Sequence, residues 1–132
     1  MIPDGLTIYT SQRNPKQTMD RAAAAVAEYG LSVFARIDHA AAAEAAGLEL
    51  RATEVLIFGN AKIGTPLMKV QQTAGIDLPQ KILVWQREDG GVSLAYNDPY
   101  WLAKRHLAEH GADQILEKMA TTLAAIATKA VG

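Results

Sequence analysis

Five short stretches of the chain have the residue pattern of β-strands: residues 6–10, 31–37, 54–58, 81–87 and 92–96. Along the second stretch successive side chains alternate between two faces, as in a strand with one covered face. The third stretch is apolar beyond Glu54, which predicts a strand covered on both faces. The last two flank Asp89-Gly90, a dipeptide typical of tight hairpin turns, so we expect them to pair.

Apolar residues at helical spacing predict helices after each of the first three strands and two more after the last strand. The first helix begins at Asn14, with Pro15 at its first position and Gln17 placed to complete a capping box. The N-caps predicted for the next three helices are Asp38, Thr65 and Asp98. The order βαβαβαββαα predicts one α+β domain over residues 1–132, with a mixed five-stranded sheet and helices packed mainly on one face.

Composition narrows the possible classes of function. The chain has 132 residues, 49% of them hydrophobic and 20% charged, and a formal net charge of −1. Such a nearly neutral chain, without a long run of Lys and Arg, is not expected to bind nucleic acid. It contains no cysteine, which excludes disulfides, thiolate nucleophiles and Cys-based metal sites. Neither a signal peptide nor a membrane-spanning apolar run is evident, so we expect a cytoplasmic protein without a membrane partner.

The direction of the strands predicts where polar residues gather. A helix joins the strands at residues 31–37 and 54–58, so we expect them to be parallel through a right-handed crossover. The strand at residues 92–96 is expected to run the same way. The three strand ends would then meet at one edge of the sheet, where open α/β sheets bind ligands. The ligand-binding residues predicted there are Asp38, His39, Asn60, Lys62, Thr65, Tyr96, Asn97 and Asp98.

One hypothesis for this edge is a homodimeric binding module. Asn60, Lys62 and the amides near Thr65 would suit a small anionic ligand, because helix N-termini present unbonded N–H groups. The partner at the same edge could also be a protein or an amphipathic molecule.

Two other hypotheses remain open. One is an enzyme that uses His39 as acid and base, with Lys62 holding an oxyanion and Asp38 or Asp98 assisting. The other is a dimer with a purely structural role. Helix capping alone would also account for Asp38, Thr65 and Asp98.

Two motifs that suggest catalysis fail in their details. Residues 59–65 resemble a phosphate-binding loop, but that motif has lysine directly after its second glycine, and here threonine and proline follow. His106 and His110 have the spacing of an inverted zinc-protease motif. Catalytic zinc takes three protein ligands, and among the histidines only His39, on another element, could approach them. We therefore predict neither a metal nor a cofactor.

Large apolar side chains on the strands suggest self-association. If their faces match across the sheet, five of them lie on the face that the helices leave open: Phe34, Leu56, Phe58, Leu83 and Trp85. An exposed apolar patch of this size favours a homodimer, since closed homo-oligomers are common.

Several motifs in the central part of the sequence occur together: VFARIDHA at residues 33–40, LIFGN at 56–60, GTPLM at 64–68, LVW at 83–85 and YNDP at 96–99. In this combination the chain resembles the bacterial and archaeal domain of unknown function 302. Ala61 stands where the family commonly has proline. The resemblance implies a small α+β fold that is often homodimeric, with no agreed reaction and no catalytic residues to transfer.

Overall fold

A computed structural model describes residues 2–132 of the chain. Its strands are β1 (Leu6–Ser11), β2 (Ser32–Asp38), β3 (Thr53–Gly59), β4 (Gln80–Gln86) and β5 (Val92–Asn97). Its helices are α1 (Pro15–Glu28), α2 (His39–Ala45), α3 (Ala61–Val70), α4 (Pro99–Arg105) and α5 (Asp113–Val131), with a short 3-10 helix η1 (Gln72–Ile76) before β4. This confirms the predicted α+β class and element order.

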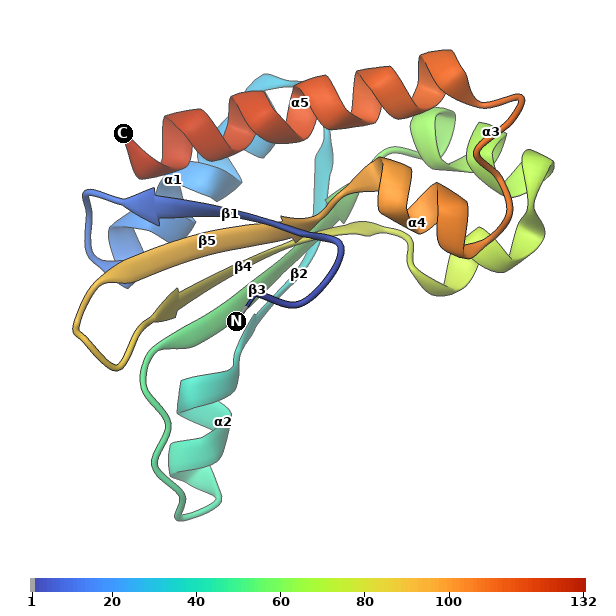
Figure 1. The fold of residues 1–132 in the computed structure, drawn as a ribbon. Helices are drawn as coiled ribbons and strands as arrows, with labels where there is room; N and C mark the ends of the chain where they lie inside the picture. Colours follow the sequence, from blue (N-terminus) through green and yellow to red (C-terminus); the bar gives the residue numbers. More distant parts are fainter. Residues whose placement is uncertain (1) are drawn as a thin grey trace.

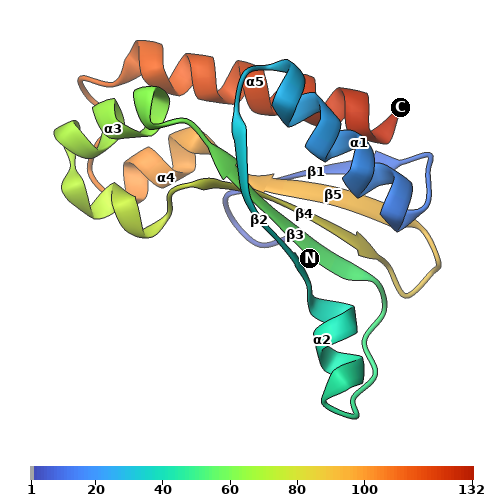
Figure 2. The same cartoon turned by 180° about the vertical axis from the view of Figure 1, so that it is seen from behind.

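The sheet has the order β1-β5-β4-β3-β2, and all four neighbouring pairs are antiparallel. The prediction that β2 and β3 are parallel is therefore wrong, and the sheet is not mixed. A crossover helix must pack back on the sheet, but α2 buries none of its residues. Figures 1 and 2 show α2 projecting from the end of the sheet, so β2 and β3 form a long hairpin with α2 at its tip.

Helices α1 and α5 lie side by side across one face of the sheet (Figures 1 and 2). The main core lies between these helices and the strands; its largest buried side chains include Met19, Val26, Leu56, Phe58, Ile82, Val84, Leu94 and Ile126. On β3, Leu56 and Phe58 point into this core, whereas Val55 and Ile57, which point to the other face, are only half-buried. β3 is therefore covered on one face rather than on both.

The apolar group that we predicted on the open face is divided between the two faces. Leu56 and Phe58 belong to the core beneath the helices. Val55 pairs with Leu83 and Thr53 with Trp85, which places Leu83 and Trp85 on the opposite face. Side chains on opposite faces cannot form one patch, so this part of the prediction is wrong.

Three of the predicted helix caps are confirmed by the structure. Asn14 accepts a hydrogen bond from the Gln17 amide at 2.8 Å, and the Gln17 side chain completes the capping box. Asp38 and Asp98 cap α2 and α4. The cap predicted at Thr65 is wrong, because Asn60 begins α3 several residues earlier and places Thr65 inside that helix.

A second, smaller core joins α3, η1 and α4 to the first half of α5. Its buried members are Leu67, Ala74, Ala103, Ala108, Ala112, Leu116 and Met119. This cluster lies beyond the ends of β3 and β5, opposite to the end that carries α2 (Figure 1). Between residues 2 and 132, no helix has both the length and the apolar character needed to cross a membrane.

Candidate functional site

The residues predicted to form one ligand site lie at two opposite ends of the strands of the sheet. Asp38 is paired near the start of β3, whereas Gly59, at the end of β3, is paired with Ser32. His39 follows Asp38 in the chain and therefore lies far from Lys62, which follows the other end of β3. The prediction that three strand ends meet at one place is thus wrong, because β2 and β3 are antiparallel. Within one chain, His39 and Lys62 do not share a pocket as the enzyme hypothesis requires.

Two of the three strand ends do share an edge. β3 and β5 are each antiparallel to β4, so they run in the same direction. Their ends carry the other six predicted residues: Asn60, Lys62, Thr65, Tyr96, Asn97 and Asp98. Asn60 Oδ1 accepts a hydrogen bond from the Lys62 amide at 2.8 Å, and Asp98 Oδ1 accepts one from the Tyr100 amide at 2.9 Å. Both side chains therefore act as helix caps.

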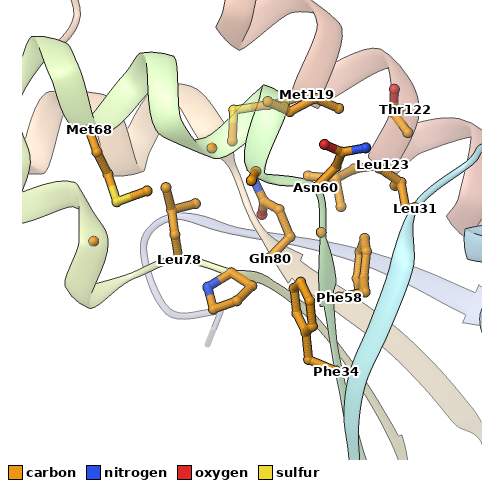
Figure 3. A pocket seen from close by; sticks show the side chains of 16 residues that line it. Leu31, Phe34, Phe58, Asn60, Met68, Leu78, Gln80, Met119, Thr122 and Leu123 are labelled. Atoms are coloured by element: carbon orange, nitrogen blue, oxygen red, sulfur yellow. The ribbon is translucent and has the colours of Figure 1, made fainter.

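An apolar pocket of about 220 Å³ opens at the edge where β3 ends (Figure 3). The buried side chains that line it are Phe58, Gln80, Met119 and Leu123. The exposed residues at its mouth are Phe34, Ala61 and Pro79. The other lining residues are Leu31, Gly59, Asn60, Ile63, Gly64, Met68, Gly75, Leu78 and Thr122. None of the lining residues is charged, and of the eight predicted ligand-binding residues Asn60 alone lines this pocket.

Gln80 is the unusual member of this lining. It is only 9% exposed, and its amide nitrogen Nε2 is buried without a hydrogen-bond partner in the described part of the chain. Figure 3 shows its side chain extending into the space between Leu78, Asn60 and Phe58. An unpaired buried amide costs about 1–3 kcal/mol of folding stability, so this group calls for an explanation. We did not identify Gln80 from the sequence, since a glutamine in a strand carries no distinctive signal.

Phe34 reaches the mouth of the pocket through an irregularity in β2. The pairing with β3 shifts between Val33 and Ala35, which makes Phe34 the extra residue of a β-bulge. A bulge interrupts the alternation of side chains and can turn one of them toward a nearby site. The ring of Phe34 thereby lines the pocket beside Phe58 and Gly59.

A second, wider hollow of about 810 Å³ lies between the start of α1 and the projecting α2. Its lining includes Asp38 and several ionic side chains. Asp20 accepts from Lys16 at 2.9 Å and from Arg36 at 2.8 Å, and Arg36 also contacts Glu54 at 2.8 Å. These charges already neutralise one another. The hydrogen bonds from Lys16 and then Arg36 hold the pKa of Asp20 below its ordinary value.

The two histidines of the zinc-like motif do not form a metal site. α4 ends at Arg105, so His106 and His110 do not share a helical face. His106 is buried; its Nδ1 lies 3.0 Å from the Thr73 hydroxyl, and its Nε2 bonds to Asp77. Among residues 2–132 there is no cluster of three or more His, Asp or Glu side chains that could hold a metal ion. These hydrogen bonds of His106 instead connect η1 with the end of α4.

Curated proteins similar to this chain are longer than it is. The chain is 40% identical over all 132 residues to "Fluoride-specific ion channel FluC 1" of Brucella suis biovar 1, and the match covers 52% of that protein. It is also 40% identical to a protein of the same name from Brucella abortus biovar 1, of which it covers 49%. The chain therefore spans about half the length of the curated relatives it matches.

A solved structure has the same fold. It is an uncharacterized conserved DUF302 protein from Bacillus stearothermophilus, with a TM-score of 0.85, 97% of this chain and 99% of that chain covered, and 16% sequence identity. The family described as "Domain of unknown function DUF302" matches residues 7–126, nearly the whole chain. The resemblance noted in the sequence is thereby confirmed, and the chain belongs to the DUF302 family.

Proposed function

We propose that this protein is a binding module whose apolar pocket holds one small, largely apolar molecule. The observation that carries the proposal is the combination of a 220 Å³ apolar hollow with the unpaired amide of Gln80. Small-molecule sites are concave and mostly apolar, with few polar groups that fix the orientation of the ligand. A bound ligand would fill the volume of the pocket and would give the amide of Gln80 a hydrogen-bond partner.

The lining supports this role in a second way. Met68 and Met119 contribute flexible thioether side chains, which adapt to irregular ligands. Three glycines, Gly59, Gly64 and Gly75, form part of the wall. At Gly64 an added Cβ would lie 3.7 Å from Leu78 and 3.9 Å from Met68, which are ordinary contact distances. A larger side chain at this position can therefore enter the pocket without displacing the backbone.

Gly64→Leu tests the proposal. We expect the variant to remain folded, since leucine favours a helix over glycine by roughly 1 kcal/mol, and to lose binding of toluene. Binding is measured by saturation-transfer NMR with toluene as the probe. The matched control is Ala24→Leu, at an exposed position of α1 away from the pocket, which should bind as the wild type does. Equal toluene binding by the wild type and Gly64→Leu would refute the assignment of the pocket.

Self-association is part of the same proposal. Three exposed apolar side chains belong to the segment around α2: Ile37 near the end of β2, and Leu48 and Leu50 after α2. This segment projects from the body of the protein (Figure 2). A second copy, packed against the projecting segment, would remove these side chains from water.

A role beside a fluoride channel is a second candidate function. The observation in its favour is the 40% identity to proteins named fluoride-specific ion channels, along one half of their length. The test is co-elution of this chain with the other half of the Brucella suis protein, purified in detergent. Separate elution at every ratio would remove this candidate and leave the pocket proposal unaffected.

A further inference from the structure

We infer that the ligand of the apolar pocket is an uncharged molecule with one hydrogen-bond acceptor, which receives its bond from Gln80. This inference rests on the proposed function and adds the chemical class of the ligand. An apolar cavity of about 150 Å³ accommodates benzene, so a volume of about 220 Å³ accommodates roughly nine non-hydrogen atoms. A ring with one short substituent has this size.

The absence of charge in the lining selects a neutral ligand. A carboxylate or phosphate in this pocket would lose its hydration without meeting a cation, because none of the lining residues is charged. This argues against the small anion that we expected from the sequence.

The amides at the start of α3 do not replace a cation. The Lys62 amide already donates to Asn60 Oδ1 at 2.8 Å. The amides of Ile63 and Gly64 donate to the Asn60 carbonyl oxygen at 2.9 and 3.0 Å. An anion would have to break these bonds to reach the amides of Lys62, Ile63 and Gly64.

Lys81 is the cation nearest in sequence to Gln80, and it is engaged elsewhere. Its Nζ donates to the carbonyl oxygens of Asp77 at 3.2 Å and Pro79 at 3.0 Å. Neighbouring residues of a strand face opposite sides of the sheet, so Lys81 leaves β4 on the side away from Gln80. The pocket therefore offers an amide donor without a positive charge.

The donor selects the functional group of the ligand. Gln80 lines the pocket, and its Nε2, which has no accessible surface as it stands, would reach the oxygen of a ketone, amide or ester after a rotation of the terminal amide. The rest of such a molecule would contact Phe58, Met119 and Leu123. A hydrocarbon of the same shape would fill the pocket but leave the amide unpaired.

Three ligands of nearly the same shape test the inference: acetophenone, α-methylstyrene and benzoate. Each has about nine non-hydrogen atoms, the size that the pocket volume allows. Acetophenone carries a ketone oxygen, α-methylstyrene replaces it with a methylene group, and benzoate carries a charge. We expect acetophenone to bind about three- to tenfold more tightly than α-methylstyrene, and benzoate to bind more weakly than both, as measured by calorimetric or NMR titration at neutral pH.

Gln80→Met is the decisive variant, because methionine keeps the length of the side chain and removes the amide. The preference for acetophenone over α-methylstyrene should disappear, while α-methylstyrene still binds. Gln86→Met is the matched control; this glutamine lies on the same strand, outside the pocket, and its replacement should leave the preference intact.

The outcomes separate the inference from the proposed function. If neither these ligands nor toluene binds, the pocket is not a ligand site and both ideas fail. If the three ligands bind equally, if benzoate binds most tightly, or if Gln80→Met keeps the preference for acetophenone, the ligand class is wrong while the pocket remains a binding site.

Discussion

At the scale of single residues, Tyr96 shows how burial changes an ionisable group. Its side chain belongs to the core under α5, and its hydroxyl lies 3.3 Å from the hydroxyl of Tyr9. Burial raises the pKa of Tyr96 well above its ordinary value, and the hydrogen bond with Tyr9 raises it further. The folded protein therefore holds this proton to a higher pH than the unfolded chain does.

The raised pKa of Tyr96 predicts a loss of stability in alkali. Above about pH 10 the unfolded chain releases the tyrosine proton while the folded state retains it, so the free energy of unfolding falls as pH rises. Below that pH, Tyr96 is protonated in both states and does not change the free energy of unfolding with pH. We expect the melting temperature of the wild type to fall as the pH rises above about 10, and that of Tyr96→Phe to fall less. Tyr100→Phe, at an exposed position, is the control. Parallel curves for the wild type and Tyr96→Phe would contradict the prediction.

At the scale of elements, three of the four predicted helix caps are confirmed, whereas the predicted direction of β3 relative to β2 is wrong. Asn14, Asp38 and Asp98 are helix caps as predicted, because a cap depends only on residues within one turn. The direction of β3 depends instead on whether α2 packs on the sheet. α2 has the sequence HAAAAEA and offers no large apolar side chain for that purpose. This signal was available in the sequence, and it argues against a crossover.

The boundary between β3 and α3 was missed for another reason. Thr65-Pro66 has the pattern of a helix start, yet Asn60 caps α3 and Pro66 lies inside the helix. An N-cap at Asn60 uses its side chain and its carbonyl oxygen together, which bond to three successive amides. Two good start signals in succession cannot be ranked from local preferences alone.

The cluster of His106, Asp77 and Thr73 gives a prediction about the junction of η1 and α4. Asp77 accepts hydrogen bonds from the buried ring of His106 and from Arg105, the latter at 2.8 and 2.9 Å. Asp77→Ala would leave a ring nitrogen of His106 buried without its partner, so we expect a loss of about 1–3 kcal/mol in the free energy of unfolding. Urea denaturation measures this loss.

Glu117→Ala provides the comparison for Asp77→Ala. Glu117 is an exposed carboxylate on α5, and its removal should change stability by less than about 0.5 kcal/mol. If both variants lose the same amount, the cluster contributes no more than an exposed carboxylate.

At the scale of the whole molecule, the pocket is a product of tertiary structure. Its lining comes from β2, β3, α3, η1, β4 and α5, which are spread over most of the chain. The sequence placed polar residues at the ends of β3 and β5 correctly, but it gave no indication that Gln80 and Met119 would meet there. Both follow from the packing of α5 against α3 and the sheet, which no local pattern encodes.

The projecting segment around α2 gives the last prediction, which concerns assembly. Leu48 and Leu50 are 66% and 51% exposed, and α2 buries none of its own residues. The bulge at Phe34 disfavours pairing of two β2 edges, so we expect two copies to meet through the apolar chain beside α2. The four successive alanines of α2 allow the α2 helices of two copies to approach closely.

The expected result is a dimeric wild type and a monomeric Leu48→Glu/Leu50→Glu variant, measured by light scattering after size-exclusion chromatography at one protein concentration. The substitutions place charges where the partner would otherwise bury leucines, so assembly becomes unfavourable, while neither leucine belongs to the buried core of the monomer. Ile76→Glu is the matched control, because Ile76 is 75% exposed at the end of η1, which packs beside α3, and its replacement should leave the mass unchanged. A monomeric wild type, or a double variant that stays dimeric, would show that this segment has no role in self-association.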